Sequence, residues 1–202
     1  LAFHPDLISQ TSLGEHIKDY SFFFYNPEEA LHLSQREKAK AVECICNIEE
    51  ELRHAIDCHS QILISRYIEL LLDHCNRFYE RQFITRCEAN KKIMKKTDVL
   101  LKDYILSGKL KYNTSPSLGY CAKILQLSSH YFNDLLKFES GKNIDEYFES
   151  KRLEMAKSML LDSNNTVSVV TEKLGYPNIR YFSRLFKRIT GVAPNNYRLS
   201  QN

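Results

Sequence analysis

The chain has 202 residues, 43% of them hydrophobic, which suits one large domain or two small ones with a packed core. Only 6 glycines and 5 prolines argue against a loop-rich or all-β protein, and no apolar run approaches the ~18 residues of a membrane span. Residues 1–97 carry 13 basic and 15 acidic side chains, whereas residues 98–202 carry 15 and 10. A basic excess confined to one half favours a nucleic-acid or membrane partner for that half.

Residues 1–33 show no regular periodicity. Pro5, Gly14 and Pro27 interrupt them, and the stretch from Tyr20 to Tyr25 is almost entirely aromatic. We therefore expect a packed but irregular segment. Because the chain begins at Leu1 and not at Met, we also expect it to be part of a longer protein.

A helical hairpin is predicted over residues 34–83. Ser34 and Glu37 fit a capping box that opens a helix to about residue 57, and a second helix follows at about 61–82. Its apolar residues step by 4, 3, 4 and 3, which is the spacing of a coiled-coil stripe: Ile64, Ile68, Leu71, Cys75 and Phe78. We expect this stripe either to dimerise the protein or to be covered by residues 1–33.

Residues 84–97 lose apolar density and contain four lysines around Ile93 and Met94. We interpret them as a linker with a solvated face. Shorter helices should follow at about 98–107, 117–126, 129–139, 144–161, 167–174 and 178–190, with a last turn opened by Pro194. The predicted fold class is all-α.

The second half of the chain contains an internal repeat. Six residues recur at a constant offset of 50, from Tyr131, Phe132, Leu135, Lys137, Gly141 and Tyr147 to Tyr181, Phe182, Leu185, Lys187, Gly191 and Tyr197. Upstream, Ala122 and Leu125 match Thr171 and Leu174 at an offset of 49. The slip of one residue falls in a turn, so the pattern predicts two helix-turn-helix units, 98–142 and 162–202, joined by a helix at 144–161.

The second helix of each unit has an apolar stripe and an opposite polar face. The stripes comprise Phe132, Leu135 and Leu136 in the first unit and Phe182, Leu185, Phe186 and Ile189 in the second. The first outward face comprises His130, Asn133, Asp134 and Lys137, and the second comprises Arg180, Ser183, Arg184 and Lys187. A recognition helix needs such a face to enter the major groove. Residues 178–191 hold four cations and no acid, whereas a solvated helix usually mixes signs. Arg180 or Arg184 fits guanine, Asn133 fits adenine and Asp134 fits cytosine.

These residues resemble a known family. Lys173-Leu174-Gly175-Tyr176, Tyr181 to Lys187, Thr190-Gly191, Pro194 and Tyr197-Arg198 are similar to the C-terminal signature of AraC/XylS transcription regulators, and the first unit matches more loosely. The resemblance covers about residues 98–202. Asp134 and Leu136 depart from the commoner Arg and Phe of the family.

The resemblance implies a transcription activator that binds promoter DNA. The implied DNA contacts are Ser129, His130, Asn133, Asp134 and Lys137 in the first unit, and Asn178, Ile179, Arg180, Ser183, Arg184 and Lys187 in the second. It further implies that residues 1–33 are the tail of a sensor module whose barrel, with most of a small-molecule effector pocket, is missing. Homodimerisation through 34–83 and contact with RNA polymerase are also implied.

Three alternatives stay open at this stage. The chain contains no P-loop, no dinucleotide-binding motif, no HExxH and no nucleophile elbow, so we expect no enzyme, no catalytic residue and no cofactor. His54 and Cys58 lie four residues apart on the predicted helix, near other cysteines and histidines, which suggests a metal or redox sensor. A non-specific architectural DNA-binding protein and a module that binds only proteins are the others. Six cysteines without a CxxC pair indicate reduced thiols in a cytoplasmic protein.

Overall fold

The computed structural model describes residues 1–112, 115–162 and 164–200. The described residues contain helices and no strand, which confirms the all-α prediction. The chain divides into two compact units, residues 1–90 and residues 91–202. The predicted helix-turn-helix unit at 162–202 includes residues 201 and 202, which lie outside the described residues. No helix among the described residues is both long and apolar enough to cross a membrane.

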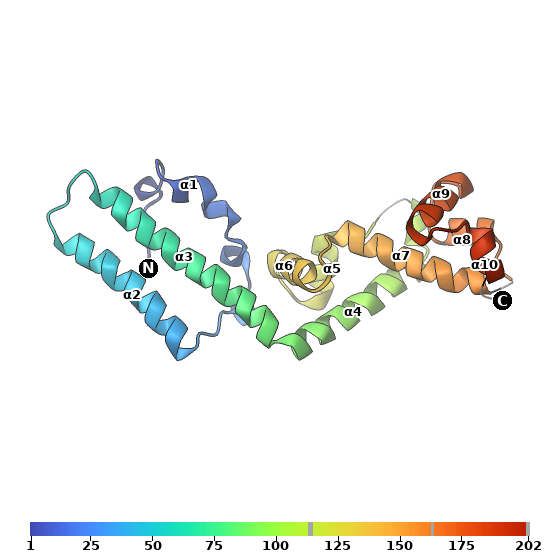
Figure 1. The fold of residues 1–202 in the computed structure, drawn as a ribbon, viewed down its shortest axis with the longest axis horizontal. Helices are drawn as coiled ribbons and strands as arrows, with labels where there is room; N and C mark the ends of the chain where they lie inside the picture. Colours follow the sequence, from blue (N-terminus) through green and yellow to red (C-terminus); the bar gives the residue numbers. More distant parts are fainter. Residues whose placement is uncertain (113–114, 163, 201–202) are drawn as a thin grey trace. The chain divides into compact units, whose positions relative to one another are not determined.

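The first unit contains the predicted hairpin, formed by α2 (Gln35–Arg53) and α3 (Ser60–Thr85) (Figure 1). The capping box that opens α2 is present: Ser34 accepts a bond from the Glu37 amide, and the Glu37 carboxylate accepts one from the Ser34 amide. The first 33 residues form α1 (Ser12–His16) and four short 3-10 turns, Pro5–Leu7, Ile17–Asp19, Ser21–Phe24 and Pro27–Glu29.

The chain's own N-terminal segment and α2 cover the first part of the predicted coiled-coil stripe. Ile64 and Ile68 are buried in one cluster with Ile8, Leu13 and Tyr20. Leu71 and Phe78 are also buried, and Cys75 is half-buried. The five residues predicted to dimerise the protein therefore do not form a free surface, because an irregular segment can fill a groove as well as a partner helix can.

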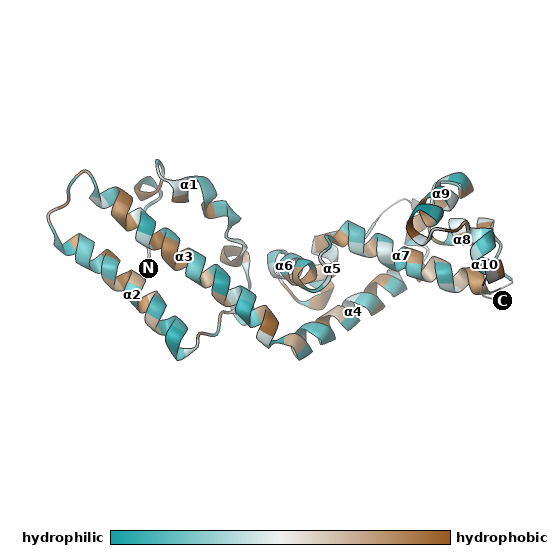
Figure 2. Cartoon of the chain, in the orientation of Figure 1, coloured by the Kyte–Doolittle hydropathy of each residue, from teal (hydrophilic) through white to brown (hydrophobic). Residues whose placement is uncertain are grey.

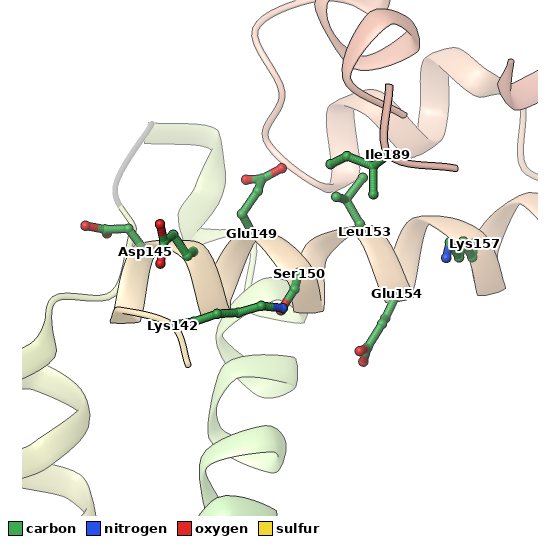
Figure 3. A pocket seen from close by; sticks show the side chains of 9 residues that line it. Lys142, Asp145, Glu149, Ser150, Leu153, Glu154, Lys157 and Ile189 are labelled. Atoms are coloured by element: carbon green, nitrogen blue, oxygen red, sulfur yellow. The ribbon is translucent and has the colours of Figure 1, made fainter. Parts of the chain in front are cut away.

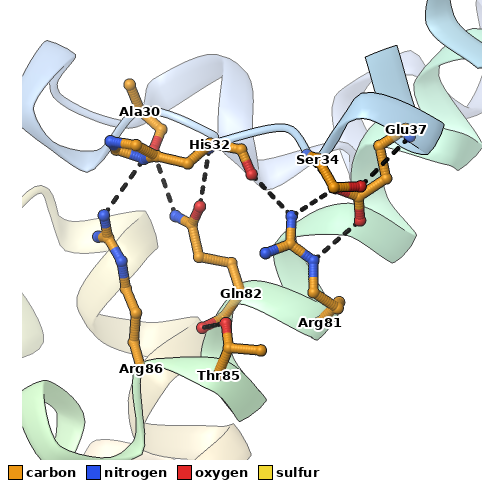
Figure 4. Close-up of polar contacts among 8 residues, drawn as sticks. All are labelled: Ala30, His32, Ser34, Glu37, Arg81, Gln82, Thr85 and Arg86. Carbon is orange, nitrogen blue, oxygen red and sulfur yellow. Dashed lines mark hydrogen bonds and ion pairs between the residues drawn. The ribbon is translucent and has the colours of Figure 1, made fainter. Parts of the chain in front are cut away.

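Polar contacts fix the segment before α2 to the end of α3 (Figure 4). The guanidinium of Arg81 donates to both Glu37 carboxylate oxygens at 2.8 Å and to the His32 carbonyl at 2.7 Å. Gln82 accepts from the His32 amide and donates to the Ala30 carbonyl. Although burial opposes it, hydrogen bonds from Ser34 and Arg81 lower the pKa of Glu37. These contacts close the hairpin opposite its loop.

The predicted linker 84–97 is helical. Helix α3 continues to Thr85, and α4 runs over Cys87–Leu106, starting well before the predicted residue 98. Lysine is a good helix former, so the four lysines of this segment are compatible with a helix and do not indicate an irregular linker. Thr97 is fully buried and Met94 packs against the core of the second unit, so part of this segment belongs to that unit.

In the part of the second unit that the structure describes, α4 is followed by η5 (Lys109–Tyr112) and six helices: α5 (Leu118–Leu125), α6 (Ser129–Ser140), α7 (Ile144–Leu161), α8 (Val167–Lys173), α9 (Ile179–Thr190) and α10 (Pro194–Ser200). In Figure 1, α7 runs from the α5–α6 pair to the α8–α10 group. A single hydrophobic cluster extends from Leu101 and Phe132 to Leu160 and Phe186, so both predicted units share one core.

Candidate nucleic-acid interface

The two helix-turn-helix turns have equivalent backbones. Gln126 and Gly175, which are 49 residues apart, both have a left-handed conformation, with φ of 59° and 68°. The same two backbone hydrogen bonds end the preceding helix in both units. In the first, the Leu127 amide donates to the Ala122 carbonyl and the Gln126 amide donates to the Lys123 carbonyl. In the second, the Tyr176 amide donates to the Thr171 carbonyl and the Gly175 amide donates to the Glu172 carbonyl. This is the Schellman motif, in which the left-handed residue ends the helix.

The slip of one residue has a structural cause. Ser128 and Asn178 are the N-caps of α6 and α9, and each accepts a bond from the amide three residues later. They are 50 residues apart, whereas the left-handed residues are 49 apart, so the additional residue is Pro177. It lies between the end of the Schellman motif and the second cap. The repeat therefore includes the caps and turns as well as the side chains.

The recognition helix of the first helix-turn-helix unit, α6, buries the predicted stripe of Phe132, Leu135 and Leu136 completely. On the opposite side, His130 and Lys137 are exposed, while Ser129, Asn133 and Asp134 are partly exposed. The Asn133 amide donates to the Asp134 carboxylate at 3.3 Å. This pair presents a donor and an acceptor side by side, and the α6 surface is close to neutral.

The recognition helix of the second unit, α9, buries Phe182, Leu185 and Phe186, and hydrophilic and hydrophobic residues alternate around it (Figure 2). Six predicted contact residues are at its surface, with Ser183 partly exposed and the others exposed: Asn178, Ile179, Arg180, Ser183, Arg184 and Lys187. The Asn178 side-chain oxygen is used by the cap, so only its amide group is available to a ligand.

Among the described residues, the cations of α9 have no acidic partner. Arg180, Arg184, Lys187 and Arg188 are exposed, and none of them forms an ion pair with a residue that the structure describes. By contrast, Arg152 on α7 is paired with Glu149 at 3.0 Å. Unpaired cations on one helix face can bind phosphates without first breaking an ion pair.

Some features of this surface were not predicted. Tyr131 and Tyr181 are equivalent in the repeat, yet Tyr131 is 4% exposed and Tyr181 is 46% exposed. Tyr181 lines a shallow hollow of about 350 Å³ with Arg184 and Arg188. Ile189, expected in the apolar stripe, is 52% exposed and borders a groove beside α7 (Figure 3). No signal in the sequence separates the two tyrosines.

The residues that suggested a metal or redox site do not share a helix in the structure. Helix α2 ends at Arg53, so His54 and Cys58 are not one turn apart on a helix. Across the ranges that the structure describes, no group of three His, Cys, Asp or Glu side chains is placed to hold a metal ion.

Comparison with known proteins identifies the fold of this region. Residues 121–200 match the family model described as a helix-turn-helix domain. This is an AraC-type helix-turn-helix domain. The AraC-type domain of this chain contains every element of the two units from α6 to α10, together with most of α5.

Two curated relatives illustrate the similarity of the AraC-type domain. The uncharacterized HTH-type transcriptional regulator YobQ of Bacillus subtilis (strain 168) is 39% identical over 77 residues, which are 38% of this chain and 32% of the relative. The raffinose operon transcriptional regulatory protein RafR of Pediococcus pentosaceus is 34% identical over 89 residues, 44% of this chain and 32% of the relative. The chain thus spans about a third of the length of these relatives.

Among solved structures, the C-terminal domain of AraT, a response regulator from Geobacillus stearothermophilus, is 27% identical with a TM-score of 0.43. The match covers 54% of this chain and 84% of that chain.

Proposed function

We propose that the second unit binds specific promoter sequences by inserting α6 and α9 into neighbouring stretches of major groove. The observation that carries this proposal is the acid-free surface of α9, where four cations are exposed and form no ion pair with any residue in the described ranges. Helix α7 has 18 residues and is about 27 Å long, which is of the order of the ~34 Å between successive turns of the major groove. A helix of this length can support two recognition helices on one side of the duplex.

We propose different roles for the two outward faces. Arg180 and Arg184 would contact guanine, while Lys187 would contact a phosphate. Asn133 and Asp134 would contact adenine and cytosine, because their amide and carboxylate match those base edges. Asp134 is unsuited to a phosphate, since both groups are negatively charged.

The test is selection of bound duplexes from a randomised library, with the 202-residue chain and the variants Arg180→Ala and Asn133→Ala. We expect two half-motifs about one helical turn apart. Each variant should lose preference at one or two base positions and keep it elsewhere. Uniform weakening at every position would contradict base recognition by these residues.

An architectural DNA-binding protein is the alternative with the same charge distribution. A specific regulator should bind its selected site ~10³–10⁷-fold more tightly than bulk DNA. A ratio near one would favour the architectural function. The dissimilar faces of α6 and α9 support specific recognition, because a protein that only wraps DNA has no need for an amide–carboxylate pair.

For the whole protein, we propose activation of transcription through contact with RNA polymerase, under the control of a small-molecule effector. The similarity to the raffinose operon regulatory protein RafR supports transcription regulation, while activation and the effector are inferred from the resemblance to AraC/XylS regulators. A reporter gene placed downstream of the selected site tests whether the protein activates or represses transcription. Expression should rise with the protein present, and repression would overturn the proposed activation.

We also propose that residues 34–83 bring two copies together. Since the predicted stripe is buried, the surface would be formed by apolar side chains that the hairpin leaves exposed, among them Val42, Leu52, Leu63 and Leu70. Sedimentation should give a dimer for the chain and a monomer for Leu63→Glu/Leu70→Glu. An unchanged dimer would exclude this surface.

A further inference from the structure

Arg152 attaches α7 to the turn of the second helix-turn-helix unit. Its Nε and Nη2 atoms donate to the Leu174 carbonyl at 3.0 and 2.7 Å, and its Nη1 atom donates to Glu149 at 3.0 Å. The side chain is only 11% exposed. Leu174 is the C-cap of α8, where carbonyl groups lack partners within the helix. Arg152, which precedes Leu174 by 22 residues, therefore supplies a hydrogen-bond donor to the end of α8.

An aromatic ring completes this arrangement. The Arg152 guanidinium lies 3.9 Å from the centroid of the Tyr176 ring, and the Tyr176 hydroxyl donates to Glu149 at 2.8 Å. Burial and the neighbouring Glu149 carboxylate raise the pKa of Tyr176. Arg152 thus contacts Leu174 and Tyr176, the residues on either side of the left-handed Gly175, and α9 begins only four residues after this glycine. A shift of this turn moves the recognition helix with it.

Arg198 of α10 forms a second attachment. It donates to the carbonyl of Leu160 at 2.9 Å and to that of Asn165. Arg152 and Leu160 are eight residues apart on α7, which corresponds to about 12 Å along the helix. One attachment would permit the second helix-turn-helix unit to rotate about it, whereas two separated attachments fix the orientation of this helix-turn-helix unit on α7.

Elsewhere the contact between α7 and α9 is loose. Ile189 of α9 and Leu153 of α7 face a groove of about 550 Å³, which charged side chains such as Glu154 and Lys157 border (Figure 3). Because this groove is not filled by protein atoms, side-chain packing there does not prevent α9 from tilting. The polar contacts of Arg152 therefore add to the shared core and to Arg198 in holding α9.

We infer that Arg152 is a positioning residue that sets the spacing between the two half-motifs which the domain selects. This inference rests on the proposed function. Arginine suits the role because its planar group can donate to a carbonyl with two nitrogens, pair with a carboxylate and stack on a ring at once, which a lysine cannot do.

The experiment measures binding of the 202-residue chain to its selected site and to sites with one base pair inserted or deleted between the half-motifs. For the unaltered chain we expect each change of spacing to weaken binding about tenfold. Arg152→Met should lower this penalty to about threefold or less while the bases chosen within each half-motif stay the same. Lys157→Met, which removes a cation from the same helix, is the control and should keep the tenfold penalty.

Two more conservative variants keep the inference testable if Arg152→Met does not fold. Arg152→Lys and Tyr176→Phe should fold and give intermediate penalties, because each removes only part of the contact. A variant that weakens all spacings equally would show a merely structural role and would overturn the inference. Failure of the unaltered chain to select any motif would instead reject the proposed function, and the inference with it.

Discussion

The two helix-turn-helix units share a backbone but differ in what holds each turn. In the first unit, Gln126 is left-handed in spite of its side chain, and the turn is closed by its own hydrogen bonds. In the second, Gly175 packs against Leu110, and Arg152 holds the preceding carbonyl. Duplication thus preserved the geometry of the turn while its surroundings diverged. The outward faces diverged as well: α6 carries an amide–carboxylate pair, and α9 carries cations and no acidic residue.

The largest effect should come from closing the space at the second turn. A Cβ atom at Gly175 would lie 2.5 Å from the Leu110 Cβ, and the left-handed backbone is itself unfavourable for alanine. Gly175→Ala should therefore lower the free energy of unfolding of the second unit by about 2–5 kcal/mol. Urea denaturation followed by circular dichroism measures this change.

Gly191→Ala is the matched control for this substitution. Gly191 is also left-handed, with φ of 81°, but nothing lies within 4 Å of an added Cβ. Only the backbone cost of about 1–2 kcal/mol should appear. Equal losses for both variants would show that the contact with Leu110 is unimportant.

The next effect compares the two outward faces. Arg184→Ala should weaken binding to the selected site by about 1–3 kcal/mol and relax the preference at one base position. Asp134→Ala should relax one position too but strengthen binding to bulk DNA, because it removes a negative charge near the phosphates. Titration of matched, mismatched and random duplexes distinguishes the two. Weaker binding of Asp134→Ala to random DNA would argue against placing α6 at the groove.

A smaller effect of opposite sign is expected at the first turn. Gln126→Gly removes the strain of a left-handed residue with a side chain, which stabilises the fold by roughly 1–2 kcal/mol. It also increases the conformational entropy of the unfolded chain, which destabilises the fold by roughly 0.4–1 kcal/mol. The net result should be a gain of about 0.5–1 kcal/mol in the free energy of unfolding. Gln126→Ala keeps the strain and should change little. Destabilisation by glycine would mean that the Gln126 side chain makes a contact of its own.

The smallest effect concerns the salt dependence of binding. Lys187→Ala should weaken binding to all sequences alike and reduce the slope of log K against log salt by about 0.9. Lys173→Ala on α8 is the control, because this lysine lies outside both outward faces. An altered base preference for Lys187→Ala would assign it to base recognition.

Much of the second unit was predictable because its helix ends carry strong local signals. Asn143, Asn178 and the glycines at 141 and 191 mark boundaries that agree with the structure to within one residue. The start of α4 was missed because a lysine-rich segment suits a helix and a solvated connection equally well. The buried stripe of α3 was ambiguous for a different reason, since periodicity shows that a face is covered but not by what.

The contacts of Arg152 were beyond prediction for a third reason. It is one of several charged residues on α7, and its main partner is a backbone carbonyl. Backbone groups have no residue identity, so no pattern of letters records such a bond. The same limit applies to Tyr131 and Tyr181, which are identical in the repeat but differ in what packs over them.

The position of Pro177 has a practical consequence for engineering. Because the additional residue precedes the cap, residues 128–141 and 178–191 are segments of equal length, each running from a capping side chain to a left-handed glycine. Each carries the signals for its own start and stop. Exchanging the outward side chains of these two segments, with Pro177 and the buried residues left in place, should transfer the base preference of one helix-turn-helix unit to the other.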